Sequence, residues 1–149
     1  VFLGYSAYSA QFASLAGAAG EGTLNMTTQA MYLGEDAPYV PEVRLMREWI
    51  QKVKPGFSPN LFAAYGWGNT RLFMKALQDA GPKAPRAGVL AALRKIDSWN
   101  GNGLFPEVGP ASKRPATCFI LVRFHDGKFE RWNSPPPGFV CRGTFFRRQ

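Results

Sequence analysis

The order of its secondary-structure patterns constrains this fold more than any other feature of the sequence. Val1–Gly4 is a short apolar run, and an alanine-rich stretch with helical spacing follows over residues 9–19. Threonines then alternate with apolar residues over 23–31, as in a half-buried strand. A strand, a helix and a second strand are therefore expected before the longer helices begin, which is an α/β arrangement.

Three amphipathic helices follow an expected loop over residues 32–39. The first begins at Pro41, a residue suited to the first helical turn, and ends at Lys54-Pro55-Gly56. The second begins near Ser58-Pro59 and ends at 79–81, and the third covers 85–96. We expect the large aromatic residues on the apolar helix faces to lie in the core: Phe12, Trp49 and Phe73.

The C-terminal third combines a β-hairpin with irregular chain. Residues 117–124 (TCFILVRF) read as a strand, Asp126-Gly127 is typical of a tight hairpin turn, and 128–132 returns as a second strand. The segment Ser134–Gly138 contains three successive prolines, which lack the N–H that a β-ladder requires. We expect the tail beyond it to be irregular.

Length and composition exclude several classes of protein. A chain of 149 residues, 46% hydrophobic, can form one medium-sized domain with its own core. Two cysteines are too few for a disulfide scaffold, and one histidine is too few for a histidine-rich metal site. The first twenty residues carry no charge, but polar residues and glycines interrupt them, so they predict neither a membrane-spanning helix nor a signal peptide. The start at Val1, inside an apolar strand, suggests a processed chain or a piece of a longer one.

The net charge of +8 is unevenly divided along the chain. Residues 1–50 carry two basic and five acidic groups (net −3), whereas 51–149 carry sixteen basic and five acidic groups (net +11). A basic half can attract phosphate groups. The basic residues are scattered, however, without a long run or an aromatic-interleaved RNA motif, so we do not expect a nucleic-acid partner.

No catalytic or cofactor-binding motif is present. There is no Walker loop, and Pro106 stands where a dinucleotide fingerprint needs its third glycine. The segment Gly4–Tyr8 lacks the second glycine of a nucleophile elbow, and His125 beside a hairpin turn is the only candidate base. The adjacent carboxylates Glu35 and Asp36 lie in a Gly/Pro loop, where we expect them to be solvated. We therefore expect no enzyme, no cofactor and no metal.

Four aromatic residues differ from those on the helix faces. They lie in loops or at helix beginnings among serines and glycines, where a ring can project into a cleft or pack into the core: Tyr5, Tyr8, Tyr65 and Trp67.

Six short motifs, taken in order, resemble the C-terminal portion of type I periplasmic solute-binding proteins of the branched-chain amino acid ABC transporter family. The resemblance covers most of residues 1–133, although Gly68 replaces the family's usual Asp and Trp67 its usual Tyr. The motifs are Glu21-Gly22, Gly66–Asn69, Ala76–Gly81, Arg86–Leu93, Gly101–Val108 and Asp126–Phe129.

The resemblance implies a fragment of a two-lobed fold, with three-layer α/β/α lobes joined by crossovers. Residues 1–32 would end the second lobe, 33–112 would return to the first lobe with three helices, and 113–149 would cross back with the hairpin and the Pro-rich tail. A whole protein of this kind needs more than twice this length, so a missing N-terminal part would supply most of the first lobe.

The implied function is that of the extracellular solute-binding component of an ABC importer, which closes on an amino acid or a small carboxylate, aromatic ones included, and presents it to a membrane permease. Tyr5, Ser6 and Ala7 match one ligand-contacting position of the family, and Trp67, with Tyr65 nearby, matches another. A serine hydroxyl can bind an amino or carboxylate group, and an aromatic face attracts an ammonium group. Two alternatives stay open: a sensory ligand-binding domain, and a binder of nucleic acid or another anionic polymer.

The implied location is periplasmic or extracellular, with lipid anchoring through the missing N-terminus as one form of it. An exported protein can keep a disulfide, and a Cys118–Cys141 bond would tie the tail to the last long strand, adding about 3 kcal/mol by loop entropy. Two buried free thiols are the alternative.

Overall fold

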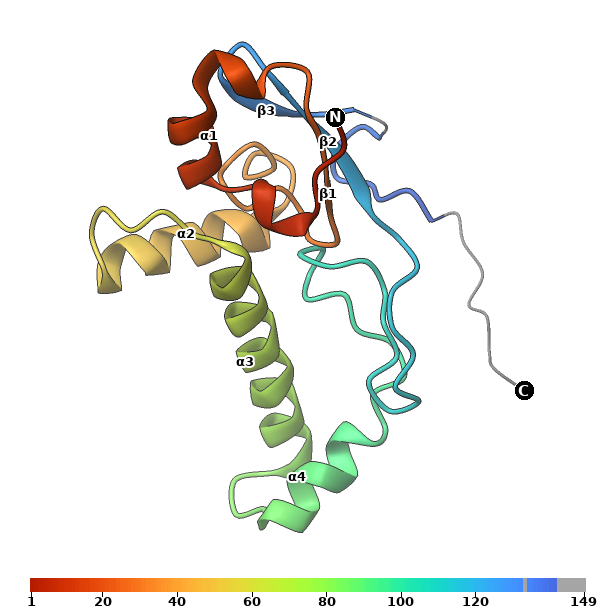
Figure 1. Cartoon of the computed structure of the whole chain (residues 1–149). Coiled ribbons are helices and arrows are strands. Elements are labelled where there is room, and N and C mark those ends of the chain that lie inside the picture. Colours follow the sequence, from red (N-terminus) through yellow and green to blue (C-terminus); the bar gives the residue numbers. More distant parts are fainter. Residues whose placement is uncertain (133, 142–149) are drawn as a thin grey trace.

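The computed structural model of the chain describes residues 1–132 and 134–141. It contains helices and one three-stranded sheet, as expected for an α/β chain (Figure 1). In chain order the elements are η1 (Tyr5–Ala7), α1 (Ala10–Ala16), η2 (Gly17–Gly20), β1 (Leu24–Thr27), α2 (Pro41–Val53), α3 (Leu61–Ala80), α4 (Arg86–Leu93), β2 (Ile120–His125) and β3 (Lys128–Arg131).

The sheet joins the two ends of the chain. β2 lies in the middle and pairs antiparallel with both β1 and β3, with Asn25 opposite Val122 and Phe124 opposite Phe129. The predicted hairpin is confirmed, and Asp126 and Gly127 both have positive φ (49° and 71°), as the favoured two-residue hairpin turn requires. The strand predicted over residues 1–4 is reduced to a parallel bridge between Phe2 and Leu24.

The helices begin and end at residues that satisfy their free backbone groups. The Ser9 hydroxyl accepts a hydrogen bond from the Phe12 N–H (3.1 Å) at the start of α1, and Asn60 does the same for Ala63 (3.0 Å) at the start of α3. Gly81, with φ of 90°, ends α3.

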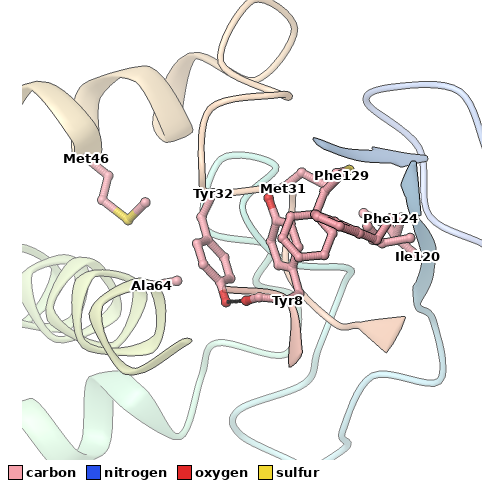
Figure 2. Close-up of a cluster of buried hydrophobic side chains, with 9 residues drawn as sticks. Tyr8, Met31, Tyr32, Met46, Ala64, Ile120, Phe124 and Phe129 are labelled. Carbon is pink, nitrogen blue, oxygen red and sulfur yellow. Dashed lines mark hydrogen bonds between the residues drawn. The ribbon is translucent and has the colours of Figure 1, made fainter. Parts of the chain in front are cut away.

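The main hydrophobic core lies between the sheet, α2 and the beginning of α3 (Figure 2). Tyr8 and Tyr32 are fully buried at its centre with ring centroids 4.8 Å apart, and the Tyr32 hydroxyl donates to the Tyr8 carbonyl (2.7 Å). Met46 from α2 and Ile120 from β2 complete it. The three predicted ranges 1–32, 33–112 and 113–149 thus contribute to one core, and their division between lobes remains a prediction.

α3 leads away from the sheet to α4, and a smaller apolar cluster holds these two helices together (Figure 1). Phe12 packs against the main core as expected, with its ring 5.5 Å from that of Phe124. The expectation for Trp49 and Phe73 is wrong, because their side chains are 49% and 51% exposed. Their helix faces are apolar, but no hydrophobic core cluster of the described residues includes either side chain, and the Trp49 ring is covered only in part, by Lys52.

Candidate functional site

The predicted ligand-contacting residues Tyr5, Ser6 and Ala7 form the short helix η1. It directly follows the Phe2–Leu24 bridge, which runs parallel to β1. Thr28 directly follows β1, so η1 and Thr28 lie at the same carboxyl edge of two parallel segments. That edge is where ligands bind in α/β sheets. Tyr5 and Ser6 are exposed, and Ser6 and Ala7 help to line a shallow hollow of about 380 Å³.

Tyr65 reaches the same edge from α3. Its hydroxyl lies 3.1 Å from the Thr28 hydroxyl, and its ring stacks on Phe105 with centroids 5.9 Å apart and planes 15° from parallel. Tyr65 is 39% exposed, so part of its ring remains available to a ligand. The structure therefore joins Tyr65 to the edge that carries η1. We call the set Tyr5–Ala7, Thr28, Tyr65 and Phe105 the strand-end edge.

Phe105 is a member of this edge that the sequence reading missed. Its ring lies against Gly68 of α3, where a β-carbon would be only 2.0 Å from the Phe105 Cε2 atom. It also lies against Gly101, where a β-carbon would be 2.9 Å from Cδ2. The departure of Gly68 from the family's usual Asp was the available signal, because a glycine inside a helix often marks the close approach of another group.

Trp67 lies on another side of α3. Two residues along a helix turn the side chain by about 200°, so Trp67 and Tyr65 point in different directions. The Trp67 indole N–H donates to the Glu42 carboxylate of α2 (2.7 Å), and its ring lines a groove of about 600 Å³ between α2 and α3 together with Trp49 and Ile50. The structure thus does not bring Trp67 together with Tyr5–Ala7 and Tyr65.

Glu42 is a buried charged group, 4% exposed, that connects three segments. Besides the Trp67 indole N–H, its carboxylate accepts a hydrogen bond from the Asn102 side-chain amide (2.9 Å), and it forms an ion pair with Arg71, whose Nε atom lies 2.9 Å away. These contacts link α2 to α3 and to the glycine-rich segment that carries Phe105. Hydrogen bonds and ion pairs that involve a charged group are stronger than neutral ones, so Glu42 helps to hold these three segments together.

The two adjacent carboxylates of the 32–39 loop are not both solvated, contrary to expectation. Asp36 is 1% exposed and forms an ion pair with Arg131 of β3 (2.6 Å), and it also accepts the Met31 N–H (2.7 Å). Glu35 is partly buried and accepts the hydroxyl of Tyr8 (2.6 Å). Burial raises the pKa of the Glu35 carboxyl above its ordinary value, and burial also raises the pKa of the Tyr8 hydroxyl.

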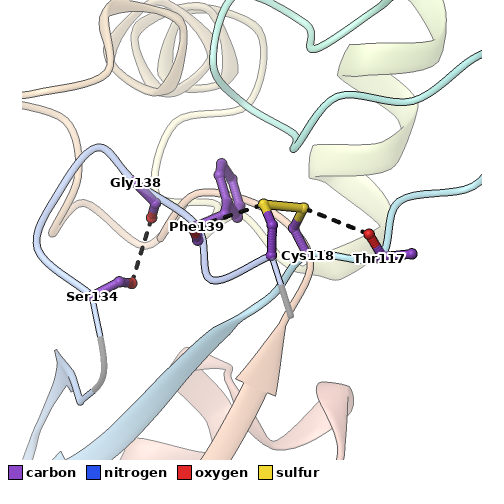
Figure 3. The surroundings of a disulfide bond; sticks show 6 residues. Thr117, Cys118, Ser134, Gly138 and Phe139 are labelled. Carbon is purple, nitrogen blue, oxygen red and sulfur yellow. Dashed lines mark hydrogen bonds between the residues drawn. A yellow bond between two sulfur atoms is a disulfide. The ribbon is translucent and has the colours of Figure 1, made fainter. Parts of the chain in front are cut away.

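The disulfide between Cys118 and Cys141 is present, which decides between the two alternatives for these cysteines (Figure 3). Next to it, Phe119 and Val140 exchange two backbone hydrogen bonds (3.0 and 2.9 Å). The Arg131 guanidinium donates to the Ser134 hydroxyl (3.1 Å) and to the Gly138 carbonyl (2.5 Å), so the segment 134–141 is tied to the body at both ends. The predicted tail beyond residue 141 lies outside the described residues.

No helix within the described ranges is both long and apolar enough to cross a membrane.

Comparison with known proteins agrees with the resemblance seen in the sequence. A protein of Rhodospirillum rubrum assigned to a branched-chain amino acid ABC transporter is 26% identical, with a TM-score of 0.66 over 89% of this chain and 36% of its own. A branched-chain amino acid ABC transporter protein of Thermus thermophilus with bound valine is 17% identical, with a TM-score of 0.67 over 90% of this chain and 38% of its own.

An extracellular ligand-binding receptor from Rhodopseudomonas palustris is 18% identical, with a TM-score of 0.64 over 88% of this chain and 39% of its own. The chain therefore spans little more than a third of the length of these proteins. No curated protein matches it. The family model described as "Periplasmic binding protein" matches residues 1–128, and the chain belongs to this family.

Proposed function

We propose that this chain is part of a two-lobed solute-binding protein that serves an ABC importer and binds an amino acid or a small carboxylate between its lobes. The observation that carries the proposal is the contact between Tyr65 and Thr28, which places Tyr65 of α3 at the same edge as η1. Family membership supports a periplasmic or extracellular location and a binding role rather than a catalytic one.

The chemistry of the strand-end edge suits such a ligand. The exposed Ser6 and the hydroxyls of Tyr65 and Thr28 can donate to a carboxylate or accept from an ammonium group. The stacked rings of Tyr65 and Phe105 offer an apolar surface for a side chain. Binding then stabilises a closed arrangement of the two lobes by hinge motion, without any covalent step.

The second lobe surface would come from polypeptide outside this chain. α3 and α2 expose several large apolar side chains, including Phe62 (80% exposed) and Phe73 (51%) of α3 and Trp49 (49%) of α2. Exposed apolar side chains that gather on one face, as Trp49 and Met74 do along the groove between α2 and α3, are typical of a surface that another segment covers. In the full protein we propose that these faces are covered by the missing N-terminal part, which completes the first lobe.

The proposal is tested by screening the full-length protein against the twenty amino acids and small aromatic carboxylates. Binding is detected first as a thermal shift, and the affinity of each ligand found is then measured by calorimetry. A true ligand raises the melting temperature in proportion to the logarithm of its concentration. Ser6→Ala and Tyr65→Phe should each weaken binding about tenfold, the effect of one hydrogen bond to a charged group.

Two tryptophan variants complete the design. Trp132→Ala is the matched control, because Trp132 lies beyond β3 and stacks on Arg123 rather than at the strand-end edge. Trp67→Ala probes the groove between α2 and α3, and we expect it to change binding less than Tyr65→Phe does. Equal affinities for Ser6→Ala, Tyr65→Phe and Trp132→Ala would contradict the proposed site. Binding of nucleic acid that falls steeply with salt, without any response to solutes, would contradict the proposed function.

A further inference from the structure

A cluster of metal-binding side chains lies at the hairpin end of the sheet. It consists of Glu21, which precedes β1, and of His125 and Asp126, which end β2 and begin the turn to β3. The potential ligand atoms of the three residues all lie within 4.8 Å of one another, and all three side chains are exposed. The sequence excluded a histidine-rich site, but it did not predict that a carboxylate 104 residues away would meet the only histidine.

Glu21 is placed to orient the histidine ring. One of its carboxylate oxygens lies 2.5 Å from the His125 Nδ1 atom, and the other accepts the backbone N–H of Asp126 (3.0 Å). The Nδ1 atom therefore carries the proton when the ring is neutral, and the Nε2 atom keeps its lone pair. A carboxylate on the far nitrogen is the usual partner of a metal-binding histidine, because it fixes the tautomer and raises the basicity of the ring.

The second nitrogen faces a second carboxylate at a suitable distance. The His125 Nε2 atom and the Asp126 Oδ2 atom are 3.6 Å apart. Two ligands at the usual Zn–N and Zn–O distances on a tetrahedral ion are about 3.4 Å apart, so one ion fits between them with little movement. The Asp126 carboxylate makes no other side-chain contact in the described residues and is 86% exposed, which leaves the remaining coordination positions open to water.

The backbone around the cluster is fixed. The Gly22 N–H donates to the Phe124 carbonyl (2.9 Å), and the Phe124 N–H donates to the Thr23 carbonyl (2.9 Å). The nearby cation Arg123 is held by Glu130 (2.6 Å from its Nε) and lies over the ring of Trp132. Both segments that supply the ligands are thus held together by the sheet itself, before any ion binds.

We propose that His125 Nε2 and Asp126 Oδ2 bind a divalent transition-metal ion such as Zn²⁺, with Glu21 as the positioning residue. With two protein ligands and two water molecules the site exchanges its ion readily, and it lies on a different part of the sheet from the strand-end edge. The inference does not depend on the proposed solute-binding function, and it can be tested with no solute present.

The experiment is a Zn²⁺ titration of the protein that is followed by calorimetry and by NMR of the imidazole. The chain has one histidine, so its imidazole gives one set of ring resonances. We expect a saturable one-to-one shift of the His125 ring resonances, with the nitrogen shifts placing the ion on Nε2. His125→Gln and Asp126→Asn should each weaken binding at least tenfold. Glu21→Gln should weaken it by about 10 to 100 fold and redistribute the His125 tautomers, an effect expected of an orienting carboxylate.

Glu107→Gln is the matched control, because Glu107 is an exposed carboxylate paired with Arg114 at a different place in the fold. Its affinity for Zn²⁺ should equal that of the unmodified protein. Unchanged Zn²⁺ affinity in His125→Gln, or His125 resonances that do not move at millimolar Zn²⁺, would overturn the proposal. Circular dichroism of each variant confirms that the fold is retained, as expected for changes at exposed positions.

Discussion

Gly68 and Gly66 lie two residues apart in α3, and replacing each by alanine should change stability in opposite directions. Alanine favours a helix by about 1 kcal/mol over glycine. At Gly66 a β-carbon would meet nothing within 4 Å, so Gly66→Ala should stabilise the protein by about 1 kcal/mol. At Gly68 the β-carbon would lie 2.0 Å from the Phe105 ring, which must therefore move. Overpacking of this severity costs about 3 kcal/mol, so Gly68→Ala should destabilise the protein by about 2 kcal/mol.

A double-mutant cycle with Phe105→Ala isolates the contact. Once the ring is removed, Gly68→Ala should become stabilising by about 1 kcal/mol, because only the helix propensity remains. The free energy of unfolding is measured by urea denaturation for the unmodified protein, the three single variants and the Gly68→Ala/Phe105→Ala double variant. If Gly68→Ala stabilises the protein as much as Gly66→Ala does, Phe105 does not lie against Gly68, and Phe105 is not part of the strand-end edge.

Three further predictions concern the loop carboxylates and the tail. Burial raises the pKa of the Glu35 carboxyl above its ordinary value of 4.5. The contribution of this group to the free energy of unfolding should therefore be complete below about pH 4.5 and be lost as the pH rises through the folded-state pKa. Urea titrations at several pH values measure this loss, and Glu35→Gln should remove it. Arg131→Met leaves the buried Asp36 carboxylate without its ion pair and should cost about 3–5 kcal/mol of unfolding free energy, whereas the double change with Asp36→Leu should restore much of it. Reduction of the Cys118–Cys141 bond should cost about 3 kcal/mol and speed the amide hydrogen exchange of residues 119 and 140, and unchanged exchange would show that the tail is held without it.

The elements that the sequence predicted are those determined by local chemistry. The starts of α1 and α2 follow from Ser9 and Pro41, and the hairpin turn follows from Asp126-Gly127, because caps and turns act over a few residues. α3 begins just after the predicted Ser58-Pro59, with Asn60 as its N-cap. The order of the short motifs was enough to predict the family, which the match over residues 1–128 confirms. The first strand was overestimated, since its pairing depends on a distant partner.

The predicted binding residues show where this reasoning stops. Tyr65 and Trp67 are nearly adjacent in sequence, and only the packing of α3 shows that one meets Thr28 and the other meets Glu42. Trp49 and Phe73 were expected in the core from helical periodicity, which identifies an apolar face but not what covers it.

Local patterns in this sequence therefore determine the helices, the hairpin and the family. Only the tertiary structure shows the Asp36–Arg131 ion pair, the contact between Glu21 and His125 and the packing of the Phe105 ring against two glycines. The first two contacts join residues that are far apart in the chain. The third depends on the space beside Gly68 and Gly101, which have no side chain to fill it. Their free energy comes from burial and electrostatic pairing across the fold, which no local pattern encodes.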